Sequence, residues 1–116
     1  MEFEFKKKNP NLLKRKKDSE NLLKKNSNCV PVICEKKPNS TLENCDKTNF
    51  LVPKEFSADQ FIYLLRKRLD LTKDQNLFLL SNENDLIDGE IKFYEIYSKF
   101  KNNDDGFLYI SYSNNI

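Results

Sequence analysis

The apolar segment at residues 107–113 constrains the fold more than any other feature of this sequence. Alternate side chains of a strand face opposite sides, and here both sets are apolar: Leu108, Ile110 and Tyr112 on one side, Phe107 and Tyr109 on the other. A strand with two apolar faces is typical of the centre of a sheet that is covered on both sides. Only three residues follow it, Asn114, Asn115 and Ile116. The sequence therefore predicts a central strand at the C-terminal end of the chain.

Three further segments are predicted as strands. Residues 29–35 (CVPVICE) are rich in β-branched residues, with Pro31 near the start where a missing backbone donor is tolerated. Cys29, Pro31 and Ile33 share one face and Val30, Val32 and Cys34 share the other. Residues 50–53 (FLVP) form a second short strand that ends at a proline, and residues 77–81 (LFLLS) form a third.

Two helices are predicted between these strands. Ser57 and Gln60 form a capping box, and Phe61, Leu64, Leu65 and Leu69 follow at helical spacing, which predicts a helix over residues 58–69. A second stripe predicts a helix that contains Phe93, Ile96, Tyr97 and Phe100. One or two short helices are expected in residues 9–25, with a narrow apolar face formed by Leu12, Leu13, Leu22 and Leu23.

The resulting order, strand–strand–helix–strand–helix–strand, favours an α+β fold of the ubiquitin-like β-grasp type. In that fold a hairpin is crossed by a helix, and the last strand lies in the centre, parallel to the first. The 116 residues suit one domain. We expect residues 29–116 to form the β-grasp domain, with a four-stranded mixed sheet, and residues 1–28 to form a helical extension packed on its open face.

Composition removes several classes of function. The chain has no His and only two Gly, so Ser-His or Cys-His catalysis and a glycine-rich phosphate loop are not expected. Its three Cys lack metal-ligand spacing, which favours free thiols, and we expect no cofactor, no metal and no enzyme activity. No apolar run approaches the length of a membrane span or a signal-peptide core, and the default compartment is the cytosol.

Four segments in order resemble the autophagy ubiquitin-like modifiers, a family that includes the gamma-aminobutyric-acid-receptor-associated protein and the microtubule-associated-protein light chains. They are VPVICE, FLVP, QFIYLLRKR and FLYISYS. The resemblance extends over nearly the whole chain, from about Met1 to Ser113. It implies a β-grasp core with two additional N-terminal helices.

The resemblance also implies a binding module for short W/F/Y-x-x-L/I/V peptides, which add a strand to the edge of the second strand. The aromatic pocket would consist of Asp18, Leu22, Pro31, Ile33, Leu51 and Phe107. The aliphatic pocket would consist of Phe50, Val52, Pro53, Phe56, Phe61 and Leu64. Taken singly, each of these residues also suits an ordinary core, and only their joint match favours binding.

Acidic residues usually flank the peptides that this family binds, and Lys47 and Arg68 match positions that receive them. Asn49 and Cys29 stand where the family usually has basic residues. Exposed charge pairs contribute little, about 0–1 kcal/mol each. We therefore expect peptide binding that depends less on acidic flanks than is typical of the family.

Members of the family are conjugated through a C-terminal glycine to phosphatidylethanolamine by activating and conjugating enzymes, and then recruit cargo receptors and autophagy machinery. This implies a monomer that is cytoplasmic, and autophagosomal when lipidated. No such glycine ends this sequence; we expect that the chain has been cut short of it, and the alternative is a cytosolic peptide-binding adaptor that is never conjugated.

Residues 1–28 hold nine Lys and Arg against four Asp and Glu, a charge that also suits tubulin, nucleic acid or an anionic membrane. Residues 29–116 hold eleven Lys and Arg against fourteen Asp and Glu, and a basic helix that docks on this mildly acidic part is the simpler explanation. No base-stacking array or known nucleic-acid motif is present, and we expect no nucleic-acid binding.

Overall fold

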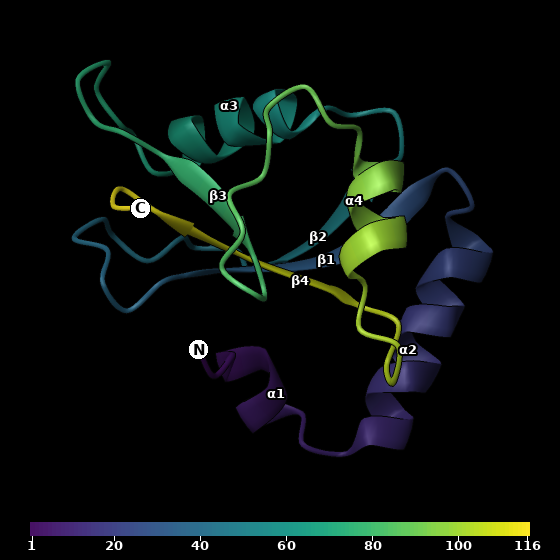
Figure 1. The fold of residues 1–116 in the computed structure, drawn as a ribbon. Helices are drawn as coiled ribbons and strands as arrows, with labels where there is room; N and C mark the ends of the chain where they lie inside the picture. The colour runs from purple at the N-terminus through teal and green to yellow at the C-terminus, as the bar shows by residue number, and fades with distance from the viewer.

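A computed structural model describes all residues, 1–116, as four helices and four strands around one sheet (Figure 1). The elements in chain order are α1 (Glu4–Lys8), α2 (Leu12–Lys25), β1 (Cys29–Lys36), β2 (Asn49–Pro53), α3 (Ala58–Arg68), β3 (Phe78–Ser81), α4 (Phe93–Phe100) and β4 (Leu108–Ser113). No helix has the length and apolar character needed to cross a membrane.

The strands lie in the order β2-β1-β4-β3. β1 and β2 form an antiparallel hairpin, β4 runs parallel to β1, and β3 is antiparallel to β4. Every residue of β4 is buried. The prediction of a central last strand, parallel to the first, is confirmed, and so is the ubiquitin-like α+β architecture.

One face of the sheet packs against α3 and α4 (Figure 1). Its core holds 16 buried residues, among them Val32, Phe61, Phe93 and Ile110. α3 begins with the predicted capping box: Ser57 Oγ accepts from the Gln60 N–H at 3.2 Å, and the Gln60 side chain accepts from the Ser57 N–H at 2.8 Å. The cap and the apolar face together place α3 across the sheet.

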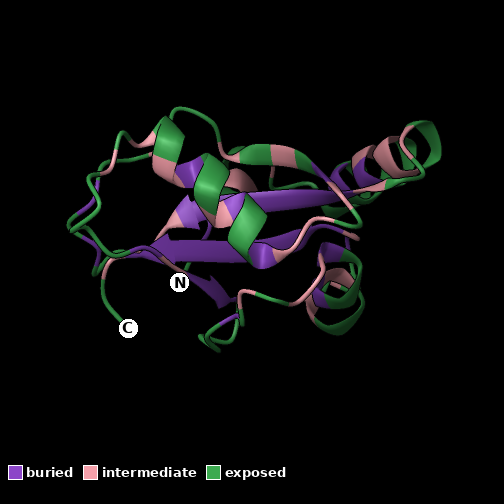
Figure 2. Cartoon of the chain, turned by 90° about the horizontal axis from the view of Figure 1, so that it is seen from above, coloured by how far each residue is buried: buried purple, intermediate pink, exposed green.

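The other face packs against α1 and α2 (Figure 1) and has a much smaller apolar core. Four buried residues form it, namely Phe3, Ile33, Phe107 and Tyr109, and Leu22 packs beside them. Figure 2 shows the central strands β1 and β4 buried along most of their length between the helices, whose outer sides are exposed. The β1 side chains divide between the two cores as their alternation predicted, with Val30, Val32 and Cys34 on one side and Ile33 on the other.

The N-terminal helices correct two expectations. A helix forms at Glu4–Lys8, before the segment in which helices were expected, and residues 12–25 form one continuous helix. The expected apolar face of α2 is also wrong for Leu12 and Leu13, whose side chains are exposed, Leu13 by 76%. The residues that α2 buries are Arg15 and Ser19, because the contact that fixes its N-terminal half is polar.

Candidate functional site

A cavity of about 570 Å³ opens between α2 and the β1–β2 hairpin. Its apolar surface comes from Phe5 of α1, Leu22 of α2, Ile33 of β1, Leu51 of β2 and Phe107 before β4. Val32 and Phe50 add to the apolar lining, and the polar and charged lining residues are Asp18, Asn21, Lys25, Lys47 and Asn49. The cavity is therefore an apolar pocket with a rim of mixed charge, a common form for sites that bind an apolar side chain.

The alternation of side chains along the strands determines which of them form the floor of this cavity. Leu51 lies on the face of β2 opposite to that of Val52, which is buried in the α3 core. Leu51 stays 38% exposed because α2 does not cover it, whereas Ile33 beneath is fully buried. An apolar side chain that enters the cavity would complete the burial of Leu51.

Five of the six residues predicted for the aromatic pocket come together at this cavity. Asp18, Leu22, Ile33, Leu51 and Phe107 line it. Pro31 is buried and lies opposite Leu51 in the β1–β2 register, but it does not line the cavity. Sequence reasoning missed Phe5, whose segment (EFKKK) shows no apolar periodicity.

The residues predicted for the aliphatic pocket lie in several different places. Phe56 and Leu64 line a shallow hollow of about 320 Å³ at the start of α3, together with Asp59, Gln60 and Tyr63. Val52 and Phe61 do not line this hollow and are buried in the core of 16 residues. Phe50 lines the first cavity and touches Phe61, with ring centroids 5.1 Å apart, and Pro53 is half-buried at the end of β2.

The two basic residues predicted to receive acidic flanks have different surroundings. Lys47 lines the cavity, and its Nζ lies 5.2 Å from the centre of the Phe50 ring. Arg68 is already paired, since its Nη1 lies 3.1 Å from both carboxylate oxygens of Asp46. The hydrogen bond from Arg68 holds the pKa of the Asp46 carboxyl below its ordinary value.

β2 is an edge strand, since it pairs with β1 on one side only. An edge strand offers unpaired backbone N–H and C=O groups to another extended chain. The cavity lies directly beside this edge, so a peptide added to β2 would bring its side chains to the cavity.

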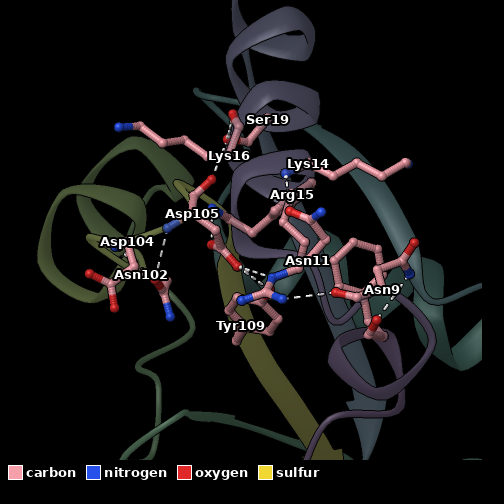
Figure 3. A network of polar contacts seen from close by, with 12 residues as sticks. Asn9, Asn11, Lys14, Arg15, Lys16, Ser19, Asn102, Asp104, Asp105 and Tyr109 are labelled. Atoms are coloured by element: carbon pink, nitrogen blue, oxygen red, sulfur yellow. Dashed lines mark hydrogen bonds and ion pairs between the residues drawn. The ribbon is translucent and has the colours of Figure 1, made fainter.

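A buried polar network fixes α2 against the sheet beside the cavity (Figure 3). Asp105 is fully buried, and its Oδ2 accepts from Arg15 Nε at 2.9 Å and from the Tyr109 hydroxyl at 2.5 Å. Its Oδ1 accepts from the Phe107 N–H at 2.9 Å, and its backbone carbonyl accepts from the Ser19 hydroxyl. Burial, and then the bond to the Asp105 carboxylate, raises the pKa of Tyr109 well above its ordinary value.

The glycine after Asp105 is required by this arrangement. Gly106 has φ of +82°, and a Cβ there would lie 2.6 Å from Ser19 Oγ. Sequence reasoning did not find the network, because its partners lie 90 positions apart in the chain. A charged residue on the sheet-facing side of α2 was the only signal.

No group of three or more Cys, Asp and Glu side chains is arranged to hold a metal ion. All three cysteines are free, and burial raises the pKa of the Cys34 thiol. The site therefore consists of an apolar cavity, a shallow second hollow and an open strand edge.

Comparisons with known proteins identify the family of this chain. The family described as "Autophagy protein Atg8 ubiquitin like" matches residues 14–116. "Autophagy-related protein 8" of Coccidioides immitis is 38% identical over 113 residues, which cover 97% of this chain and 94% of the relative. The protein of the same name from Kluyveromyces lactis is 39% identical over 100 residues, 86% of this chain and 79% of the relative. The crystal structure of Trypanosoma brucei ATG8 superposes with a TM-score of 0.82 at 35% identity, covering 89% of this chain and 87% of that one.

Proposed function

The chain belongs to the Atg8 family of autophagy ubiquitin-like proteins, and from that premise we propose that it binds short W/F/Y-x-x-L/I/V peptides of cargo receptors and autophagy proteins. The aromatic residue of the peptide enters the cavity between α2 and the β1–β2 hairpin. The aliphatic residue occupies the hollow formed by Phe56 and Leu64. The peptide backbone pairs with the open edge of β2.

The observation that carries this proposal is the position of the apolar cavity beside a free strand edge. Backbone pairing supplies sequence-independent affinity, and pockets for particular side chains supply selectivity. The second hollow lies just beyond the end of β2, since Phe56 follows Pro53 by three residues. This arrangement supports a single extended peptide that reaches both sites.

The proposal includes the family's modification. Where a C-terminal glycine is present, activating and conjugating enzymes join it to phosphatidylethanolamine, and the otherwise cytoplasmic monomer is then carried on autophagosomal membranes. The alternative is an adaptor that binds peptides and is never conjugated. Mass spectrometry of the protein from starved cells tests this, because a lipid-modified form supports the modifier and its absence supports the adaptor.

Peptide binding is tested by fluorescence anisotropy with a labelled peptide of the W-x-x-L type. Leu51→Ala removes apolar area from the cavity and is expected to weaken binding about 5- to 30-fold, the effect of losing about 1–2 kcal/mol. Leu86→Ala is the matched control, because Leu86 is exposed beside β3 at the opposite edge of the sheet. Equal affinities of the two folded variants and the unchanged chain would contradict the assignment of the cavity.

The same assay tests the contribution of acidic flanks. Arg68 is bound to Asp46, and Asn49 at the cavity rim carries no charge, which leaves Lys25 and Lys47 as the cations that line the cavity. The peptide for this test carries Glu residues before its aromatic residue. Replacing them by Gln is expected to change the affinity less than about fivefold. A larger loss, together with a steep dependence on salt, would show that the flanks matter here as they do elsewhere in the family.

A further inference from the structure

Phe5 of α1 forms one wall of the cavity. Its half-buried ring lies edge-to-face on Phe107, with centroids 5.1 Å apart and planes at 65°. Phe107 also lines the cavity, so the two rings form a continuous aromatic corner. An aromatic guest that enters here meets rings from two segments that lie at opposite ends of the chain.

The position of Phe5 depends on contacts that α1 makes with the sheet. α1 has only five residues and none of them is buried, so it is not stable alone. The Glu35 carboxylate of β1 accepts from the N–H groups of Glu4 at 2.8 Å and of Phe5 at 2.9 Å. Phe3, just before α1, is buried against Tyr109 with ring centroids 5.1 Å apart.

Glu35 is itself buried, and its two oxygens satisfy two of the N–H groups that a helix leaves without partners at its first turn. The bond to the Phe5 N–H fixes the backbone that carries the ring into the cavity. Glu35 therefore acts on the cavity through Phe5, although Glu35 does not line it.

We propose that Phe5 is a specificity-determining residue of the peptide site, which favours an aromatic over an aliphatic guest, and that Glu35 is its positioning residue. The inference rests on the proposed function and adds α1 to the binding site. Aromatic rings in edge-to-face or offset contact attract each other beyond the effect of buried area, and an aliphatic guest lacks this contribution. Without Phe5 the corner keeps only one of its two rings, Phe107, beside Leu22, Ile33 and Leu51, which accept both kinds of guest.

The test compares two labelled peptides that differ only at the aromatic position, one with Trp and one with Leu. Phe5→Ala is expected to weaken binding of the Trp peptide about 5- to 30-fold and that of the Leu peptide much less. The ratio of the two affinities therefore falls. Phe5→Leu, which keeps an apolar side chain at the wall, is expected to lower the ratio with a smaller loss of affinity.

Glu35→Gln tests the positioning role. Its side chain has one acceptor oxygen in place of two, so in the same position it can accept only one of the two backbone hydrogen bonds that the carboxylate accepts. It is expected to lower the Trp-to-Leu ratio a few-fold and to add little in the double variant with Phe5→Ala. Lys7→Ala is the matched control on α1, because its exposed side chain pairs with Glu2 and Glu4 and does not line the cavity. It should leave both affinities unchanged.

The possible failures are distinguishable. If the unchanged chain binds neither peptide, the proposed function is overturned and this inference with it. If the unchanged chain binds the Trp peptide and folded Phe5→Ala keeps the same Trp-to-Leu ratio, only the inference on α1 is overturned. Fully additive losses in the double variant would overturn the positioning role of Glu35.

Discussion

The two faces of the sheet are covered in different ways. The face under α3 and α4 is sealed by a core of 16 buried residues, whereas the face under α1 and α2 has four. On that second face, buried polar contacts replace the missing apolar area. Asp105 holds α2 through Arg15, and Glu35 holds α1 through two backbone N–H groups.

This difference explains why the cavity lies where it does. Apolar packing is dense and leaves few voids, so a helix held by it covers the sheet completely. Hydrogen bonds and ion pairs are directional, and they can hold a helix at a few points while apolar surface between those points stays open. Leu51, Phe107 and Leu22 lie in such an interval, between the contacts of α1 and those of α2.

Among the variants that compare the two faces of the sheet, Phe61→Ala is expected to change the free energy of unfolding most. Phe61 is 1% exposed and touches Phe50 and Phe93, with ring centroids 5.1 and 5.2 Å away. Its removal should lower the free energy of unfolding by about 3–5 kcal/mol, measured by urea denaturation. Tyr63→Ala, at an exposed position of the same helix, should cost far less. A stable Phe61→Ala variant that had lost only peptide affinity would place Phe61 in the peptide site.

Asp105→Asn is expected to lower the free energy of unfolding by less than Phe61→Ala does, and also to weaken peptide binding. The amide keeps the shape of the carboxylate but removes the charge that Arg15 and Tyr109 face. Hydrogen bonds to charged groups contribute about 1.5–3 kcal/mol, and the free energy of unfolding should fall by this amount. Because α2 forms a wall of the cavity, affinity for the W-x-x-L peptide should fall as well.

Asp104→Asn is the control for that change, since Asp104 is exposed and its side chain makes no hydrogen bond. Unaltered stability of Asp105→Asn would show that the polar network does not hold the second face. A loss of stability with full peptide affinity would show that the cavity does not depend on how α2 is fixed.

The sequence predicted the apolar face of the fold better than the polar one. Alternation in residues 107–112 and the helical stripes of α3 and α4 identified the central strand and the helices that cover it. These signals are local and follow directly from strand and helix periodicity. α1 gave no such signal, because five residues of mixed charge become a helix only when Glu35, about 30 positions away, accepts their N–H groups.

Within the candidate site, too, the residues fixed by local periodicity could be predicted and those fixed by distant contacts could not. Parity along β1 and β2 correctly placed Ile33 and Leu51 on the face turned toward α2, where both line the cavity. The same parity would have assigned Val52 to the core, since it lies opposite Val30 on the other face of the hairpin. Phe5 and Asp105 were out of reach, because their partners are fixed only by the tertiary fold.

The smallest expected effect concerns Tyr112, which lies in the core under α3, whereas Tyr109 faces α1. The Tyr112 hydroxyl donates to the Glu43 carbonyl and accepts from the Cys45 N–H, and burial raises its pKa to about 12. In the unfolded chain a tyrosine ionises near pH 10, so between about pH 10 and about pH 12 only the unfolded state loses the proton and stability falls. Tyr112→Phe should cost about 1 kcal/mol at pH 8 through its lost hydrogen bonds. Urea titrations would measure the free energy of unfolding of the unchanged chain and of Tyr112→Phe. The difference between the two free energies should narrow as pH rises through this window, and a constant difference would contradict the raised pKa.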